Sequence, residues 1–307
     1  MIEPLLQVRD LSVRYGAASV LEDVNFDLLA GETLGLVGES GSGKSTLARA
    51  LLRLVPVSRG EVLWRGRNLL SCGAAEMRKH RRDLQIVFQD PLSSLNPRMT
   101  AGQILAEPLK IFEPALSARD RQARIDAMLE RVGLGKAVAR RYPREFSGGQ
   151  CQRIGIARAM MLNPQLIVCD EPVSSLDVSI QGQIVNLLLD LQRDFGIALL
   201  FISHNLAVVR HLSRRVLVIY LGRLVEIAPR DALFAAPVHP YTRGLLAAAS
   251  GVALGEAEPP PSERPSGCVF RARCPHRQDL CAVAQPALQA VGPEHFVACR
   301  RARELMS

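Results

Sequence analysis

Hydrophobic and polar positions along the chain follow two kinds of pattern. Continuous or alternating apolar runs predict strands at residues 7–15, 32–37, 84–88, 166–169, 198–202 and 216–220. Apolar residues at helical spacing predict helices at residues 44–54, 150–162, 179–195 and 205–211. Strands and helices that take turns along a chain are typical of α/β proteins, so we predict a sheet domain of this class.

The middle of the chain breaks this rhythm. From about residue 98 to 162 the pattern indicates helices, among them 118–132, and it predicts an α-helical subdomain. Residues 251–267 contain four prolines and little apolar content, which predicts a linker. We therefore expect the main domain at 1–250 and a small Cys-rich module at 268–307.

Composition and charge restrict the class of protein only broadly. Hydrophobic residues make up 48% of the 307 residues, enough for a sizeable core, and no apolar run approaches the roughly 18 residues of a membrane span. The first residues lack the order of a secretory signal, so we expect the chain to stay in the cytosol. The net charge of +8 fits either anionic partners or an ordinary solvated basic surface.

The most specific motif is the segment Gly38 to Ser45, which reads GESGSGKS and fits the phosphate-loop pattern G-x-x-x-x-G-K-S. It follows a predicted strand and opens a predicted helix, so its backbone N–H groups and the helix N-terminus can hold phosphate oxygens. Lys44 would bridge the terminal phosphates, and the Ser45 hydroxyl would be a ligand of Mg²⁺. The segment predicts binding of ATP with Mg²⁺.

Two carboxylates, Asp170 and Glu171, directly follow a predicted strand. The carboxyl edge of such a sheet is where α/β proteins bind ligands. Asp170 can orient Mg²⁺ or its waters, and Glu171 can accept a proton from the water that attacks the γ-phosphate. Beside a phosphate loop, the pair predicts ATP hydrolysis.

Residues Phe146 to Gln150 read FSGGQ and directly precede a predicted helix. A serine and two glycines at a helix start form a second anion nest, which indicates a second nucleotide because the first ATP is already held. In this order, the segment resembles the signature of the ABC transporter ATPases. The resemblance implies a P-loop NTPase with a RecA-like sheet core, an antiparallel β subdomain and an α-helical subdomain. It also implies that ATP lies between the phosphate loop of one subunit and the signature of its partner.

The resemblance covers about residues 5–249 and implies further roles. Tyr15 matches the aromatic residue that stacks on adenine, and Gln89 matches the glutamine that senses Mg²⁺. Asp177 lies in the loop that crosses to the partner subunit, and His204 matches the switch histidine that contacts the γ-phosphate. The expected ATP-binding residues are Tyr15, Gly38, Ser40, Gly41, Gly43, Lys44, Ser45 and Thr46. The expected signature residues are Ser147, Gly148, Gly149 and Gln150; the catalytic residues are Glu171, His204 and Gln89; the Mg²⁺ ligands are Ser45, Gln89 and Asp170.

Residues 89–97 (QDPLSSLNP) and 239–242 (HPYT) resemble the F-type ATPase of the oligopeptide, dipeptide and nickel permeases. This resemblance implies a peripheral subunit at the cytoplasmic face of a bacterial inner membrane. Its implied partners are a second, unlike ATP-binding subunit, two transmembrane permease subunits and an extracytoplasmic binding protein that delivers dipeptides or oligopeptides. Nickel or another small solute is an alternative cargo, since the ATPase does not touch it.

Two other classes of ABC protein are less compatible with the sequence. Soluble ABC ATPases that act on nucleic acid or ribosomes usually carry two cassettes or long coiled-coil insertions, and this sequence has neither, so no nucleic acid is expected. A nonhydrolytic regulatory subunit would not need the intact acids.

Four of the seven cysteines lie in the last 40 residues: Cys268, Cys274, Cys281 and Cys299. Four thiolates can bind zinc or an iron–sulfur cluster, or can remain unligated, and the spacing lacks the paired C-x2-C of common zinc sites. Some members of the family that this chain resembles carry a four-iron four-sulfur cluster, which makes that cluster our first expectation. Cys72, Cys151 and Cys169 are scattered and are expected to be buried packing residues.

Overall fold

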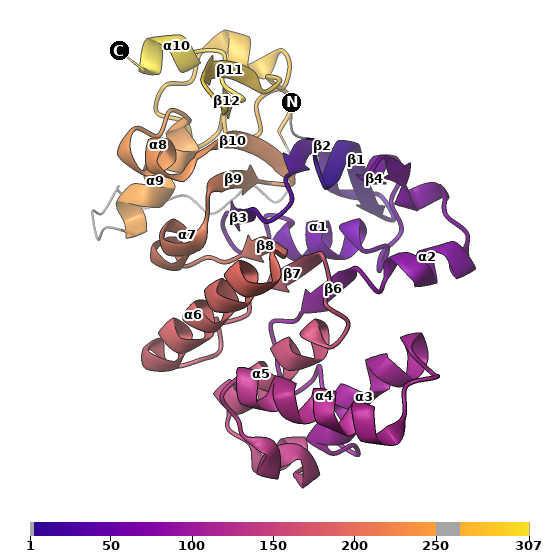
Figure 1. The fold of residues 1–307 in the computed structure, drawn as a ribbon. Helices are drawn as coiled ribbons and strands as arrows, with labels where there is room; N and C mark the ends of the chain where they lie inside the picture. Colours follow the sequence, from indigo (N-terminus) through magenta and orange to yellow (C-terminus); the bar gives the residue numbers. More distant parts are fainter. Residues whose placement is uncertain (1–2, 250–264, 307) are drawn as a thin grey trace. The chain divides into compact units, whose positions relative to one another are not determined.

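The computed structural model describes residues 3–249 and 265–306. The chain forms two compact units (Figure 1). Unit 1 comprises Met1–Leu29, Thr33–Ser71 and Ile202–Ser307, and unit 2 comprises Ala30–Glu32 and Cys72–Phe201. Most of the predicted linker, residues 251–267, lies outside the described residues.

Unit 1 begins with a four-stranded antiparallel sheet. Its strand order is β2 (Ala18–Leu28), β1 (Leu6–Tyr15), β4 (Arg59–Trp64) and β5 (Arg67–Asn68). Leu6 of β1 pairs with Leu28 on one side and with Trp64 on the other. Directly opposed residues share one face of a sheet, and all three are buried, so this face is apolar. An antiparallel β subdomain is therefore present, as the resemblance implied.

Unit 1 also holds strands of a second sheet, in the order β11 (Gln289–Gly292), β12 (His295–Val297), β10 (Arg223–Pro229), β9 (Arg215–Tyr220) and β3 (Thr33–Val37). β3 runs parallel to β9, whereas β10 is antiparallel to both β9 and β12. Every residue of β3 is buried, as expected of a parallel strand covered on both faces. The phosphate-loop segment leaves β3 and enters α1 (Lys44–Leu51).

The remaining helical segments of unit 1 are short. They are η1 (Leu69–Ser71), α7 (Leu206–Leu212), α8 (Arg230–Ala235), α9 (Pro240–Ala249), η4 (Asp279–Ala282) and α10 (Ala302–Leu305). α7 begins at an effective cap, because the Asn205 side chain accepts hydrogen bonds from the N–H groups of Ala207 and Val208.

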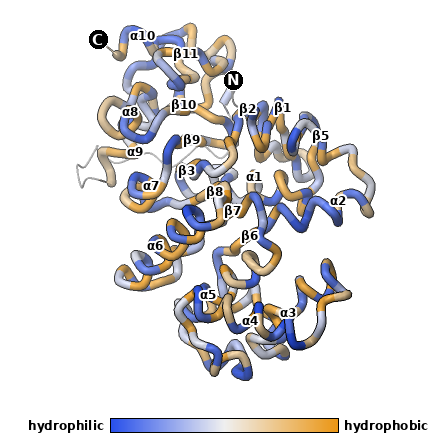
Figure 2. The backbone as a smooth tube through the Cα atoms, in the orientation of Figure 1, coloured by the Kyte–Doolittle hydropathy of each residue, from blue (hydrophilic) through white to orange (hydrophobic). Residues whose placement is uncertain are grey.

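Unit 2 contains β6 (Leu84–Val87), β7 (Leu166–Asp170) and most of β8 (Ala198–Ile202), with β7 between the other two. β6 and β7 are parallel, and β7 is buried along its whole length. Two helices of unit 2, α2 (Ala74–His80) and α6 (Val178–Phe195), accompany these strands in the sequence. Figure 2 shows both hydrophobic and hydrophilic positions along α6, whose buried residues recur at helical spacing.

The predicted helical region is confirmed in unit 2. Between residues 98 and 162, all of which are described, the structure has helices and no strand. They are α3 (Ala101–Phe112), α4 (Ala118–Arg131), η2 (Lys136–Arg140), η3 (Pro143–Glu145) and α5 (Gly148–Met160). α3, α4 and α5 contact one another. Thr100 and Gln103 cap α3 reciprocally, which fixes where this helix begins.

Each predicted strand and helix is present and differs from the observed one mainly at its ends, whereas β2, β4, β5, β10, β11 and β12 were not predicted. The helix predicted over 44–54 stops at Leu51, because Arg53 adopts a left-handed backbone with φ of 51°. The pattern did not predict β2, since Glu22, Asp23 and Asn25 interrupt its apolar positions and β1 pairs with it through register shifts.

Candidate nucleotide site

The phosphate-loop segment encloses its own lysine. The Lys44 Nζ atom donates hydrogen bonds to the carbonyl oxygens of Gly38 and Glu39, both at 2.9 Å. Lys44 is only 5% exposed, so its ammonium group lies inside the loop and not in solvent. The loop therefore holds a positive charge beside the N-terminus of α1, an arrangement suited to a bound anion.

Two glycines make this loop sterically possible. A Cβ at Gly38 would lie 2.3 Å from the backbone oxygen of Ile219, which no side chain tolerates. Gly43 has φ of 103°, and a Cβ there would lie 2.8 Å from Leu21 Cδ2. The glycines of the motif are thus required by backbone geometry as well as by any ligand.

Other expected ATP-binding residues also belong to unit 1. Ser45 and Thr46 occupy the first turn of α1 and are partly buried, and Ser40 is exposed in the loop. Tyr15 ends β1 with 46% of its surface exposed, which leaves its ring accessible. His204 follows β8 and is exposed.

Unit 2 brings the expected catalytic acid and the expected glutamine together. The Gln89 Nε2 atom lies 3.5 Å from Glu171 Oε2, at the outer limit of a hydrogen bond. Glu171 follows β7 and has a left-handed φ of 47°, a conformation that is strained for a residue with a side chain. Asp170, the last residue of β7, is 2% exposed. A strained acid beside a buried acid, at the end of a parallel strand, is typical of a reaction site.

The signature segment begins α5. Ser147 is the N-cap: its Oγ atom accepts from the Gln150 N–H at 3.3 Å, and Gln150 Oε1 accepts from the Ser147 N–H at 3.0 Å. A Cβ at Gly149 would lie 2.7 Å from Ile180 Cγ2 of α6, so this glycine permits close packing of α5 on α6. The capping box and this packing place the exposed Ser147 and Gly148 and the half-buried Gly149 at the start of the helix.

The loop between Glu171 and α6 leads to two side chains, Asp177 and Val178, that do not stabilise the start of the helix. Asp177 occupies the N-cap position of α6, yet its side chain makes no capping hydrogen bond. The next residue, Val178, is an apolar side chain with 84% exposure.

The four C-terminal cysteines converge. Cys268, Cys274, Cys281 and Cys299 line one small cavity of unit 1, together with His239 and Phe270. Burial raises the pKa of the Cys268 thiol to about 11 and also raises the pKa values of Cys274 and Cys299. Without a metal, these three groups stay protonated at neutral pH.

One contact of the phosphate loop was not predicted from the sequence. The Arg273 Nη1 atom lies 3.0 and 2.9 Å from the two carboxylate oxygens of Glu39, the second residue of the loop. The Glu39 N–H donates to the Tyr241 hydroxyl at 2.9 Å. Tyr241 lies in the HPYT segment, but the pattern of that segment alone indicates no contact with the phosphate loop.

Family profiles match most of this architecture. A profile described as "ABC transporter" matches residues 21–174, and one described as "Oligopeptide/dipeptide transporter, C-terminal region" matches residues 225–281. The chain belongs to the ABC transporter family. Membership makes it an ATP-binding ATPase and confirms the P-loop NTPase fold that the motifs implied.

Relatives of this ABC ATPase are similar along most of their length. The oligopeptide transport ATP-binding protein OppF of Haemophilus influenzae is 51% identical over 91% of this chain and 87% of its own. OppF of Salmonella typhimurium is 50% identical over 96% and 95%, respectively.

Solved structures support the same fold. CbiO1 of Clostridium perfringens, described as part of the ABC transporter complex cbiONQ, has a TM-score of 0.69 and 26% identity over 76% of this chain and 91% of its own. The ATP-binding cassette MJ0796, described as a dimer bound to ADP and Pi, has a TM-score of 0.66 and 29% identity over 73% and 98%. In the described parts of this ABC ATPase, no helix has the length and apolar character that crossing a membrane requires.

Proposed function

We propose that the chain is the ATP-hydrolysing subunit of an importer for dipeptides or oligopeptides. The observation that carries the proposal is the Lys44 ammonium enclosed by the phosphate-loop carbonyls, in a chain half identical to OppF proteins. The match of residues 225–281 to the C-terminal region of oligopeptide and dipeptide transporters favours peptide as the cargo.

In this proposal each site residue has one task. Lys44 and the loop N–H groups hold the β- and γ-phosphates, and Ser45, Asp170 and Gln89 orient Mg²⁺. Glu171 accepts the proton of the attacking water, and His204 contacts the γ-phosphate. Tyr15 stacks on adenine. The Lys44 ammonium and the loop N–H dipoles then stabilise the negative charge that develops on the phosphate oxygens during transfer.

We also propose that the signature residues bind the ATP of a second, unlike ATPase subunit. Two features support a surface that closes on such a partner: the exposed Ser147 and Gly148 at the start of α5, and Asp177, whose side chain makes no capping hydrogen bond to α6. ATP-driven closure would move two transmembrane permease subunits at the cytoplasmic face of the inner membrane, and a binding protein would deliver the cargo.

The test is transport by the assembled complex in proteoliposomes. The complex should take up labelled tripeptide in an ATP-dependent way, and a complex with Lys44→Ala should not. Uptake of Ni²⁺ without uptake of any peptide would assign the alternative cargo and overturn the peptide assignment. ATP hydrolysis that persists in Lys44→Ala would overturn the site assignment.

We further propose that the four C-terminal cysteines hold a four-iron four-sulfur cluster. All four line one cavity. The spacing of the four cysteines in the sequence lacks the paired C-x2-C of common zinc sites, which favours the cluster over a single zinc ion. When bound, the cluster would join four backbone segments through iron–sulfur bonds.

Metal analysis tests this assignment directly. Protein purified without oxygen is expected to contain about four iron and four sulfide per chain, and Cys274→Ser should lose both. One zinc per chain and no sulfide would assign a zinc site instead. Absence of both from anaerobic preparations would show that these thiols are unligated.

A further inference from the structure

Two side chains from the C-terminal part of unit 1 reach the phosphate loop: Arg273 of the Cys-rich module and Tyr241 of α9, which we together call the loop clamp. Arg273 contacts both carboxylate oxygens of Glu39, with only 13% of its own side chain exposed. Tyr241 accepts the Glu39 N–H. The clamp therefore binds both the side chain and the backbone of one residue that belongs to the phosphate loop.

Aromatic side chains pack against the clamp and fix its position. The Arg273 guanidinium lies 5.7 Å from the Tyr220 ring and 5.8 Å from the Phe270 ring, distances typical of cation–π contacts. The Tyr220 and Tyr241 rings pack at 4.6 Å, and both residues are almost fully buried. A buried aromatic cluster thus fixes the position of the arginine relative to the loop.

Charge gives the clamp a second effect. A carboxylate within a loop that binds phosphate repels the ligand, unless a positive group neutralises it. Arg273 provides that charge, and its next neighbour in the chain is Cys274, one of the four converging cysteines. Any loosening of the Cys-rich module would therefore leave the Glu39 charge without its positive partner.

We propose that Arg273 is a positioning residue through which the Cys-rich module sets the affinity of the phosphate loop for nucleotide. This proposal rests on the nucleotide-binding role proposed above. The contacts within unit 1 carry it, whatever the cysteines bind. The proposal also assigns a role to the HPYT segment, because its residue Tyr241 binds the backbone of the phosphate loop.

The test measures MgATP binding to the full chain by calorimetry. Arg273→Ala is expected to weaken binding roughly tenfold, the usual size of coupling between two sites. Adding Glu39→Gln to Arg273→Ala should restore most of the affinity, because the repelling charge is then gone. Amide hydrogen exchange at residues 38–45 should be faster in Arg273→Ala.

Arg277→Ala is the matched control, since it removes the same charge from an exposed position of the same module. Equal affinity in Arg273→Ala and Arg277→Ala would overturn the clamp, as would a double variant that binds no better than Arg273→Ala. Lys44→Ala distinguishes failure of the clamp from failure of the proposed nucleotide site. If both Arg273→Ala and Lys44→Ala bind MgATP with the natural affinity, the proposed nucleotide site itself is wrong. If only Lys44→Ala loses affinity for MgATP, the nucleotide site stands and the clamp is wrong.

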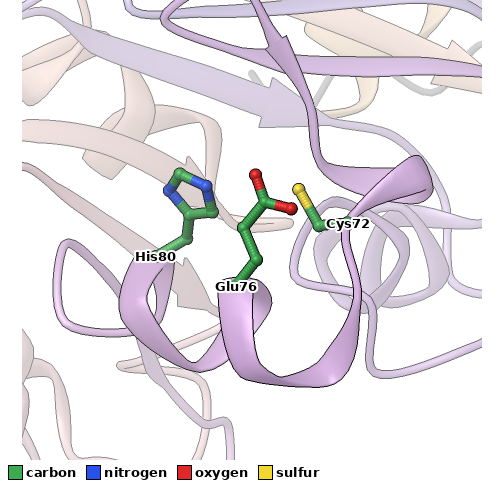
Figure 3. A group of neighbouring side chains, drawn as sticks. All are labelled: Cys72, Glu76 and His80. Atoms are coloured by element: carbon green, nitrogen blue, oxygen red, sulfur yellow. The ribbon is translucent and has the colours of Figure 1, made fainter.

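A different observation points to a metal site in unit 2. Cys72, Glu76 and His80 each offer a ligand atom, and these atoms all lie within 4.8 Å of one another. Figure 3 shows Glu76 and His80 on one face of α2, with Cys72 just before the helix. Positions four apart share a helix face, so the helix itself holds the carboxylate and the imidazole together.

The donor set selects the class of metal. Sulfur, nitrogen and oxygen together suit Zn²⁺ and similar transition metals, whereas Mg²⁺ prefers oxygen alone. The basic residues Arg78 and Lys79 of α2 are exposed and oppose any cation, so binding depends on the strong thiolate bond. We propose that these three side chains bind one Zn²⁺-class ion, with release of the Cys72 thiol proton to solvent.

Cobalt titration of the reduced full chain under anaerobic conditions tests this site. The Cys72→Ser variant should bind one equivalent of Co²⁺ less than the natural chain and should lack the thiolate-to-metal absorption of that ion. The same difference is expected when Cys72→Ser is made in a chain whose four C-terminal cysteines are serines. His80→Ala should alter the ligand-field bands, while Lys79→Gln, the exposed neighbour, should not. Unchanged stoichiometry in Cys72→Ser, in both backgrounds, would overturn the site.

Discussion

Replacement of Glu171 by glutamine is expected to lower ATP turnover about 10²- to 10⁴-fold while MgATP still binds. The glutamine side chain has almost the same shape, so the approach of Gln89 and the turn after β7 can persist. It has no carboxylate to accept the proton of the attacking water, however. Turnover is measured in the assembled transporter, and binding is measured on the full chain.

The control for this variant is Glu130→Gln, which removes one exposed carboxylate from α4 of the same unit. It should leave turnover unchanged. Hydrolysis at the natural rate in Glu171→Gln would show that Glu171 does not accept the proton of the attacking water. The strained backbone at Glu171 would then have no explanation in catalysis.

The parts of the site that were predictable from the sequence are those encoded by adjacent residues. The phosphate loop, the acids after β7 and the signature each occupy a few consecutive positions, so their local geometry follows from short-range turn and capping rules. The structure agrees: Ser147 and Gln150 cap α5 reciprocally, and Lys44 turns back into its own loop.

Contacts between residues that are distant in the sequence were not predictable. Glu39 and Arg273 are 234 positions apart. Glu39 occupies a variable position of the phosphate-loop pattern, so the motif does not indicate that its side chain pairs with an arginine. The same limit applied to β2, β10 and β12, which become strands through pairing with neighbours more than through their own pattern. Residue roles that depend on a partner subunit, such as that of Asp177, remain predictions.

A buried carboxylate of β10 joins the segment at Val238 and His239 to strand β12 within unit 1. Glu226 of β10 has no exposed surface, and it accepts hydrogen bonds from the N–H groups of Val238 and His239 and pairs with His295 Nε2 at 2.8 Å. Burial opposes ionisation of Glu226, but the hydrogen bonds, led by that from His295, outweigh burial and lower its pKa. Burial also lowers the pKa of His239 to about 4, so that ring stays neutral.

Glu226→Ala is therefore expected to destabilise unit 1 by about 3–5 kcal/mol, because it leaves two buried N–H groups and the His295 ring without their acceptor. Urea unfolding measures the loss, with the exposed Asp279→Ala as control. Glu226→Gln should also destabilise, since its amide NH₂ group would face one of the two backbone donors. Since Val238 and His239 lead into the segment that carries Tyr241, MgATP affinity should fall in both variants. A loss below about 1 kcal/mol would mean that water replaces the carboxylate, and that Glu226 does not hold Val238, His239 and His295 together.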